Sequence, residues 1–176
     1  FPAETLKEGD VLMFNTPEGG SHLPDIRLVV PIFHEGEFVG LSANLAHHAD
    51  VGGMVPGSMP STSTEIWQEG LILPPLKLYS EGVLNQAVMD ILKRNVRTPA
   101  EREGDLNAQI ACGKTAAKEL VALLEKYGRD VIFEAITELM NRAETQTRKE
   151  IEKIPDGTYH FTDWLDNDGV ELDKRI

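Results

Sequence analysis

Two short segments of the chain contain the residue types that bind divalent metals. GGSHLPDIRLVV places His22 and Asp25 on either side of a proline, and LAHHADVGG further along contains His47, His48 and Asp50. Two imidazoles and one carboxylate are enough to hold a catalytic metal, because the other coordination positions stay open for water or substrate. Zn²⁺, Mn²⁺ and Fe²⁺ are all compatible with this donor set. The first question is therefore whether the two segments meet in space.

A β-hairpin would bring the two segments together. IRLVVPIF and FVGLSANLAHH alternate as strands do, and Gly36 lies in the turn between them. Antiparallel pairing about this turn places Asp25 opposite His47, since each lies 11 positions from Gly36. The residues that share a strand face with His47 are Leu41, Ala43 and Leu45. Because that face is apolar, we expect it to be buried and His47, rather than His48, to be the ligand.

Each of these residues also has a structural interpretation. The two histidines and the aspartate can be ordinary hydrogen-bonded polar residues, since neither segment is an established metal motif. Asp50 is a candidate to orient an imidazole or to act as a general base, and equally to cap the turn at Gly52 and Gly53. The run that continues to Gly57 and Ser58 can present backbone N–H groups to a phosphate or carboxylate. It can equally be a conformationally demanding turn.

The second half of the chain has the signals of two long helices. RTPAE places Thr98 at an N-cap, Pro99 at the first helical position and Glu101 at the third, which is a capping box. Gly128 in KYGRD suits the left-handed residue that ends a helix. Apolar stripes at helical spacing run before and after this glycine. They predict two antiparallel helices with a short joint.

The fold class indicated is α+β, with a mixed, mainly antiparallel β region followed by a long antiparallel helical hairpin. We expect the β-rich region with the site in residues 1–82, the helical hairpin in residues 83–155, and the start of a following β region in residues 156–176. Gly104 and Gly113 each weaken the first long helix by about 1 kcal/mol. Close packing or a local break is therefore expected at these glycines.

Composition excludes several classes of function. The chain has 176 residues and a net charge of −12, which disfavours nucleic acid and anionic membrane surfaces as partners. No window approaches the roughly 20 apolar residues of a membrane span. A single cysteine, Cys112, cannot form an internal disulfide. A cytoplasmic location is therefore expected. Phe1 in place of an initiator Met and a turn signal near the C-terminus suggest a fragment of a longer polypeptide.

Several long runs carry a resemblance to one family. HHADVGGMVPGSMP, NVRTPAEREGDLNAQIA and IPDGTYHFTDWLDNDG occur in this order, and with the segment from GGSHLPD to LPPLKLY they span nearly the whole chain. The sequence resembles the N-terminal region of the hydantoinase B/oxoprolinase family. Members of that family are longer and work with an ATP-binding subunit or domain of the hydantoinase A type.

The resemblance implies half of an ATP-dependent enzyme. The A-type partner would use ATP to activate a small-molecule substrate, and the B-type subunit would open a cyclic amide with water, as hydantoinases and 5-oxoprolinases do. The alternatives are a subunit of an acetone- or acetophenone-type carboxylase and an assembly module that docks the A-type subunit without a complete active site. Each implies a hetero-oligomer with ATP only on the partner. The chain alone should be inactive, since it has no Walker-type phosphate loop.

The resemblance also selects site residues. The carboxylase branch carries a divalent metal in this subunit, and the matching positions here are His22, Asp25 and His47. Such a metal would polarise a carbonyl or phosphoryl oxygen and lower the pKa of a bound water. Glu65 and Glu69 are acid–base candidates only because TEIWQEG resembles a family run. Family members commonly have an Asn-Asp-Pro run where this chain has FNTP, so a threonine stands at the position of the Asp.

Overall fold

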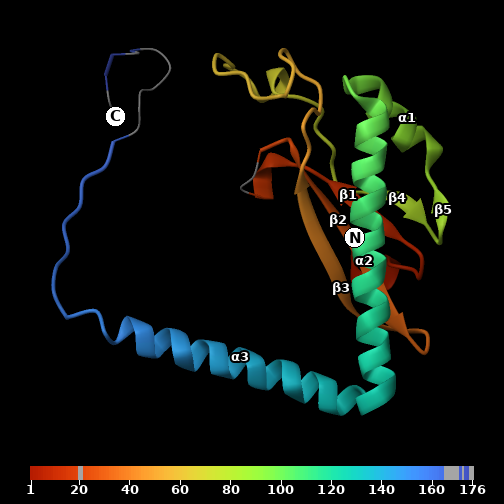
Figure 1. The fold of residues 1–176 in the computed structure, drawn as a ribbon, viewed down its shortest axis with the longest axis vertical. Coiled ribbons are helices and arrows are strands. Elements are labelled where there is room, and N and C mark those ends of the chain that lie inside the picture. The colour runs from red at the N-terminus through yellow and green to blue at the C-terminus, as the bar shows by residue number, and fades with distance from the viewer. Residues whose placement is uncertain (20–21, 165–170, 172, 175–176) are drawn as a thin grey trace. The chain divides into compact units, whose positions relative to one another are not determined.

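The protein combines one β-sheet with α-helices, which confirms the predicted α+β class. The computed structural model describes residues 1–19, 22–164, 171 and 173–174 (Figure 1). Within these residues there are five strands and three α-helices. Short 3-10 turns lie at Ala3–Thr5 (η1), Pro17–Gly19 (η2) and Ile66–Gln68 (η3). None of the helices in the described part of the chain combines the length and hydropathy that crossing a bilayer requires.

The strands form one antiparallel sheet in the order β3-β2-β1-β4-β5. Their bounds are Val11–Phe14 (β1), Asp25–His34 (β2), Glu37–His47 (β3), Leu76–Ser80 (β4) and Val83–Leu84 (β5). The β2–β3 hairpin has the predicted register, with Asp25 opposite His47. Glu35 and Gly36 form its two-residue turn with φ of 51° and 80°. Two positive φ angles match the right-handed twist of the flanking strands.

A proline cannot donate to a ladder, so the strand that contains Pro31 is expected either to lie at a sheet edge or to bend there. Its strand, β2, lies between β3 and β1. Val29 is the last residue of β2 that pairs with β1, so Pro31 has no ladder partner there. The bend is the alternative that the structure supports, because the pairing with β3 shifts between Ile32 and Phe33. A proline is tolerated where the ladder on one side has ended.

The α-helices are Gln86–Asn95 (α1), Pro99–Tyr127 (α2) and Arg129–Ile151 (α3). Helix α2 begins at the predicted proline, and Gly128 after it has the predicted left-handed φ of 85°. The Thr98 hydroxyl, in contrast, is buried without a hydrogen-bond partner among the described residues, so the predicted capping bond is not formed. The backbone carbonyl of Thr98 nevertheless accepts the first helical hydrogen bond, from the amide of Arg102.

Helices α1 and α2 cover one face of the sheet. Met89 and Leu92 of α1, and Leu106 and Ile110 of α2, pack in the same core as the sheet residues. The sheet side and adjoining loops contribute Val11, Met13, Leu23, Ile26, Leu28, Val30, Val51, Leu73 and Leu78. Figure 1 shows α2 crossing this face of the sheet. We call it the covered face.

The opposite face of the β2–β3 hairpin, which we call the open face, is exposed although we expected it to be buried. Leu41 and Leu45 of β3 are 52% and 50% exposed, and Ala43 between them is exposed as well. The prediction that the apolar odd-numbered positions of β3 are buried is therefore wrong. The physical reason is that α2 packs on the even-numbered side, where the polar Asn44 and His48 bond to it.

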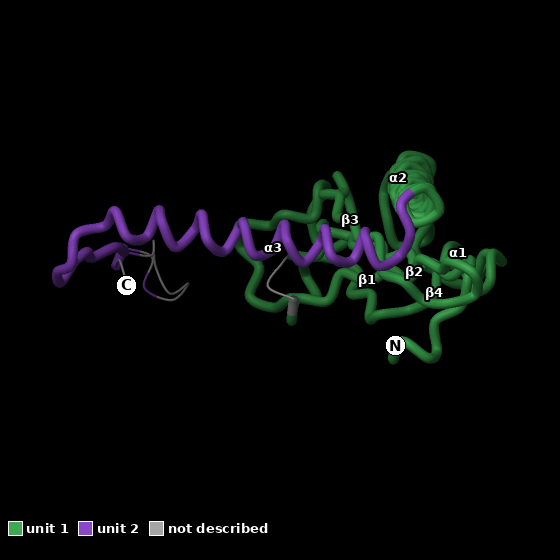
Figure 2. The backbone as a smooth tube through the Cα atoms, turned by 90° about the horizontal axis from the view of Figure 1, so that it is seen from below, with its two compact units in different colours: residues 1–126 green, residues 127–176 purple. Residues whose placement is uncertain are grey.

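The chain forms two compact units, residues 1–126 and 127–176 (Figure 2). The predicted boundary at residue 82 marks the change from strands to helices. The boundary between the two units lies at residue 126 instead, because α1 and α2 pack against the sheet. Helix α3, described throughout, has no buried residue. The antiparallel packing of the two long helices stays a prediction. No strand follows α3 among the described residues, and the predicted following β region falls partly on residues 165–170, outside them.

Candidate metal centre

The hairpin brings the three predicted ligands together. Asp25 is the first residue of β2, His47 is the last residue of β3, and His22 lies in the loop before β2. One potential ligand atom from each side chain lies within 4.8 Å of the other two. His22 Nε2 is 3.5 Å from Asp25 Oδ1, and the ring centroids of His22 and His47 are 4.8 Å apart. We call these residues the His–Asp–His cluster.

The donor set fits a divalent cation. Metal–nitrogen and metal–oxygen bonds of about 2.0–2.2 Å place neighbouring ligand atoms roughly 3 Å apart, so small side-chain rotations would close the cluster around one ion. Two imidazoles and one carboxylate would leave further coordination positions free. His47 is exposed, while His22 and Asp25 are half-buried, so the cluster is accessible from the open face.

Backbone hydrogen bonds fix the loop that carries His22. The amide of Asp25 donates to the carbonyl of His22 over 3.1 Å, which closes a turn. The carbonyl of Pro24 accepts hydrogen bonds from the amides of Ile26 and His48, at 3.0 and 2.8 Å. Leu23 is fully buried in the core. The loop is therefore tied to both strands at the end of the hairpin where the cluster lies.

His48 points to the covered face, as strand alternation requires. Its side chain is 1% exposed, and Nε2 lies 2.9 Å from Gln109 Oε1 of α2. Burial lowers the pKa of His48 below its usual value, although the hydrogen bond with Gln109 opposes this effect. Its Nδ1 has no hydrogen-bond partner among the described residues. His48 is thus an interior side chain beside the cluster, and it is not a member of it.

Asp50 is buried in a network of hydrogen bonds. Its carboxylate accepts the amides of Gly52, Gly57 and Arg97, and the Arg97 guanidinium lies 2.9 Å away. Burial alone would raise the pKa of Asp50, but these bonds from Arg97 and the glycine amides lower it below its usual value. The arrangement holds the following loop, because Arg97 also donates to the carbonyls of Gly52, Gly53 and Val55. A catalytic role for Asp50 stays a prediction.

In the glycine-rich loop, groups that were predicted to bind an anion form hydrogen bonds inside the protein. The amides of Gly52 and Gly57 donate to Asp50, as described above. Ser58 Oγ accepts a hydrogen bond from the amide of Val51 and donates to the carbonyl of Gly52, both over 2.7 Å. Positive φ angles at Gly52, Gly53 and Gly57, of 93°, 82° and 84°, make this a turn that suits glycine. Ligand binding by these four residues stays a prediction.

The acid–base candidates Glu65 and Glu69 flank η3. Glu65 is exposed and precedes this turn, and its amide faces Gln68 Oε1 at 3.4 Å. Glu69 follows the turn and accepts a hydrogen bond from Ser63 Oγ over 3.0 Å. Among the described residues, neither belongs to the metal-binding group of side chains. Their roles stay predictions.

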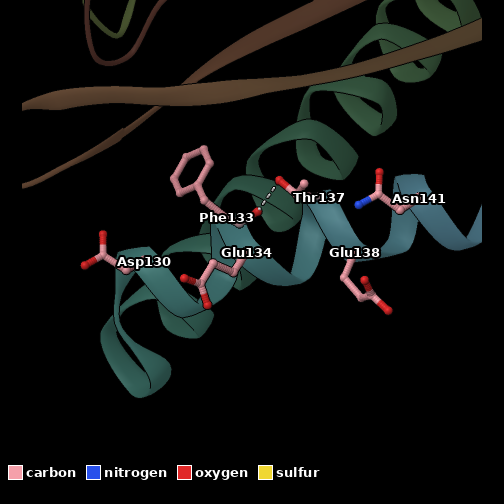
Figure 3. Close-up of a pocket in the computed structure, with 6 residues that line it drawn as sticks. All are labelled: Asp130, Phe133, Glu134, Thr137, Glu138 and Asn141. Atoms are coloured by element: carbon pink, nitrogen blue, oxygen red, sulfur yellow. Dashed lines mark hydrogen bonds between the residues drawn. The ribbon is translucent and has the colours of Figure 1, made fainter.

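Hollows also lie away from the cluster. One, of about 440 Å³, runs along α3 (Figure 3). Its lining residues are Asp130, Phe133, Glu134, Thr137, Glu138 and Asn141. All of them come from one helix, and the Thr137 hydroxyl donates to the Phe133 carbonyl one turn earlier over 3.0 Å. Another, of about 580 Å³, lies between α2 and β2 and includes Lys114 and Lys118. Neither hollow contains a residue of the cluster.

The sequence patterns did not predict the roles of three polar residues: Asn15 and Gln109 are buried, and the side chain of Arg97 is 38% exposed. Arg97 holds the loop at Asp50, and the other two bond to residues beside the ligands. Gln109 was detectable, because it is a polar residue within the apolar stripe of α2, between Leu106 and Gly113. Such a position calls for a buried hydrogen-bond partner.

Comparison with known proteins gives the family. Residues 1–176 match the family described as Hydantoinase B/oxoprolinase. The chain therefore belongs to the hydantoinase B/oxoprolinase family, as the resemblance of its motifs indicates.

Relatives and solved structures agree with this membership. The chain is 37% identical to caprolactamase subunit beta of Pseudomonas jessenii, over 98% of this chain and 30% of that protein. The crystal structure of the ATP-dependent caprolactamase from Pseudomonas jessenii matches 88% of this chain and 27% of its own, with a TM-score of 0.83 and 37% identity. Nucleotide-free acetone carboxylase matches 74% of this chain and 17% of its own, with a TM-score of 0.70 and 25% identity. The chain thus spans less than a third of the length of these proteins.

Proposed function

We propose that the chain belongs to the B-type subunit of an ATP-dependent enzyme that hydrolyses a cyclic amide, and that His22, Asp25 and His47 hold a divalent metal. The convergence of these side chains within 4.8 Å carries the proposal. The 37% sequence identity to caprolactamase subunit beta supports a cyclic amide as the substrate class.

The cluster suits this chemistry. When bound, a Zn²⁺ or Mn²⁺ ion, with Fe²⁺ as the third candidate, would polarise the substrate's carbonyl or phosphoryl oxygen and lower the pKa of a water. Asp25 supplies a negative ligand, and the two imidazoles supply nitrogen ligands without adding negative charge. The exposure of His47 gives a small molecule access from the open face. The overall reaction adds water across the amide C–N bond and opens the ring.

A partner subunit completes the enzyme in this proposal. The name "subunit beta" of the caprolactamase relative supports a hetero-oligomer, and the family resemblance supports an A-type subunit that binds the ATP. The chain itself then hydrolyses no ATP. The net charge of −12 fits a subunit without nucleic acid or an anionic membrane surface as a partner.

Turnover by the assembled enzyme tests the reaction. The longer B-type protein that contains this chain is combined with an A-type subunit, and ATP hydrolysis is measured with hydantoins, 5-oxoproline or caprolactam. We expect stimulation by a cyclic amide, its loss in His47→Ala, and its retention in His34→Ala, which changes a histidine at the other end of β2. Equal turnover in the His47→Ala enzyme would contradict the proposal.

A ketone carboxylase is the second candidate, favoured by the match to acetone carboxylase. The same metal would then stabilise an enolate instead of activating water. ATP turnover that responds to acetone plus bicarbonate, and not to cyclic amides, would select this candidate.

An assembly role is the third candidate, favoured by the exposed apolar side chains of α3. Among them are Val131, Ile136, Leu139 and Met140. Co-purification with the A-type subunit tests it: the double variant Leu139→Asp and Met140→Asp should lose the partner if α3 docks it. Retention of the partner by this variant would exclude docking through that part of α3.

A further inference from the structure

We propose that two buried carboxamides, Asn15 and Gln109, are positioning residues that hold the backbone beside all three residues of the His–Asp–His cluster. This inference rests on the proposed metal site. It adds two residues that lie on the covered face, behind the residues that would touch the metal.

Gln109 bonds to the residues that follow Asp25 and His47, through the backbone of Ile26 and the side chain of His48. Its side chain is 7% exposed, and Nε2 donates to the carbonyl of Ile26 and to Asn44 Oδ1, both over 3.0 Å. These two acceptors fix the orientation of the amide, so Oε1 faces His48 Nε2 at 2.9 Å. His48 Nε2 must therefore carry a proton and donate it. Ile26 and His48 are the residues that directly follow Asp25 and His47.

Asn15 does the same for His22. Its side chain is 1% exposed, and Nδ2 donates to the carbonyls of Leu23 and Leu71, both over 2.8 Å. The amide of Leu73 donates back to Asn15 Oδ1 over 2.6 Å. Leu23 directly follows His22. Asn15 thus joins the loop that carries His22 to the segment before β4.

The two carboxamides follow one pattern: each holds the residue that comes directly after a ligand. In a strand, successive side chains point to opposite faces, so a bond on the covered face fixes the backbone from which a ligand projects to the open face. Outer partners of this kind set ligand orientation, and their loss typically weakens metal binding about 10- to 100-fold.

Gly113 allows α2 to approach the β2–β3 hairpin closely enough for the hydrogen bonds of Gln109. A Cβ at this position would lie 2.7 Å from Val30 Cγ2, and the Asn44 amide would be 3.6 Å away. Asn44 Nδ2 also donates to the backbone carbonyl of Gln109 over 2.9 Å, which fixes the position of α2 relative to β3. The predicted close packing at Gly113 therefore serves the placement of Gln109.

Cobalt titration of the chain tests the inference. The affinity for Co²⁺ and its visible ligand-field spectrum are measured for the parent, Gln109→Ala and Leu106→Ala, together with the melting temperature of each. Leu106 is the matched control, because it is a fully buried residue of α2 with no bond to the hairpin. We expect Gln109→Ala to weaken Co²⁺ binding about 10- to 100-fold and to change the spectrum. Leu106→Ala should lower the melting temperature and leave affinity and spectrum within about twofold of the parent.

A second pair of variants keeps the test valid if Gln109→Ala does not fold. Gln109→Glu retains an acceptor for His48 but has no donor for Ile26, and Asn15→Asp has no donor for Leu23. Weakened binding in both Gln109→Glu and Asn15→Asp supports the inference. Binding within twofold of the parent in a folded Gln109 variant or in folded Asn15→Asp, or an equal loss in Leu106→Ala, overturns the inference alone. A parent that binds no Co²⁺ contradicts the proposed metal site as well.

Discussion

The two faces of the β2–β3 hairpin differ in what they contribute. The covered face packs against α1 and α2, and its residues Ile26, Leu28 and Val30 are buried. The open face carries Asp25 and His47 at one end of a strip of exposed apolar residues. Because side chains alternate along a strand, adjacent residues of one hairpin serve different purposes.

This contrast separates stability from chemistry. On the covered face the polar groups of Asn44, His48 and Gln109 bond to one another, so substitution there leaves buried groups without partners. On the open face the ligand atoms of the cluster lie within 4.8 Å of one another at an accessible end of the hairpin. Variants of the apolar residues on the covered face should therefore change folding alone, and variants of the ligands on the open face should change binding, whereas variants of Gln109 should change both.

A leucine-to-alanine pair tests the contrast most strongly. Leu28→Ala on the covered face should lower the free energy of unfolding by about 3 kcal/mol, because Leu28 is fully buried and truncation leaves a cavity. Leu45→Ala on the open face should change it by less than about 1 kcal/mol, since the side chain is half exposed. Urea denaturation of both variants measures the difference. Equal losses would show that the open face is packed as tightly as the covered one.

Buried and exposed carboxylates should also differ in their contribution to stability. The variant Asp50→Asn tests this difference at a buried carboxylate. At pH 7 this variant should lose about 2 kcal/mol, because the buried carboxylate accepts hydrogen bonds from Arg97 and two glycine amides. Urea unfolding at several pH values measures the effect. Glu119→Gln on the exposed side of α2 is the control and should change stability by less than about 0.5 kcal/mol.

The sign of the pH dependence follows from the lowered pKa of Asp50. A folded-state pKa below the unfolded value means that the contribution is present above the unfolded pKa and is lost as the pH falls through the folded-state pKa. Asp50→Asn should therefore reduce the loss of stability on acidification below about pH 4. An unchanged acid limb would show that Asp50 does not contribute to it.

Alanine substitution of the two glycines of α2 should have smaller effects on stability, and the two effects should have opposite signs. Gly113→Ala should destabilise the protein by about 1 kcal/mol, because the clash with Val30 outweighs the gain in helix propensity. Gly104→Ala should stabilise it by about 1 kcal/mol, since no atom lies within 4 Å of the added Cβ. Thermal unfolding of both variants measures the two shifts. Stabilisation by both would show that α2 does not approach the sheet closely at Gly113.

Local patterns predicted much of the fold. The turn at Gly36 fixed the pairing of Asp25 with His47, and Pro99 and Gly128 marked the ends of α2. These features depend on backbone preferences that single residues determine. The convergence of His22 with the hairpin followed from the same register.

Tertiary packing was harder to predict. An apolar strand face is not always the buried one: Leu41 and Leu45 are exposed because α2 packs on the polar side of β3. Periodicity indicates which residues share a face, and it does not indicate which face another element will cover. The bonds of Gln109 and Asn15 join residues far apart in the chain, which spacing cannot reveal.

Metal binding by the chain tests the central claim most directly. The parent, His22→Ala, His47→Ala and the control His34→Ala are dialysed to equilibrium against Zn²⁺ or Mn²⁺, and the bound metal is measured by elemental analysis. We expect about one ion per chain in the parent and in His34→Ala, and a loss of at least about 100-fold in affinity in the two cluster variants. The unfolding free energies of the metal-free chains should agree within about 0.5 kcal/mol, since the cluster lies on the open face. Equal metal content in all four chains, or none in the parent, would contradict the account.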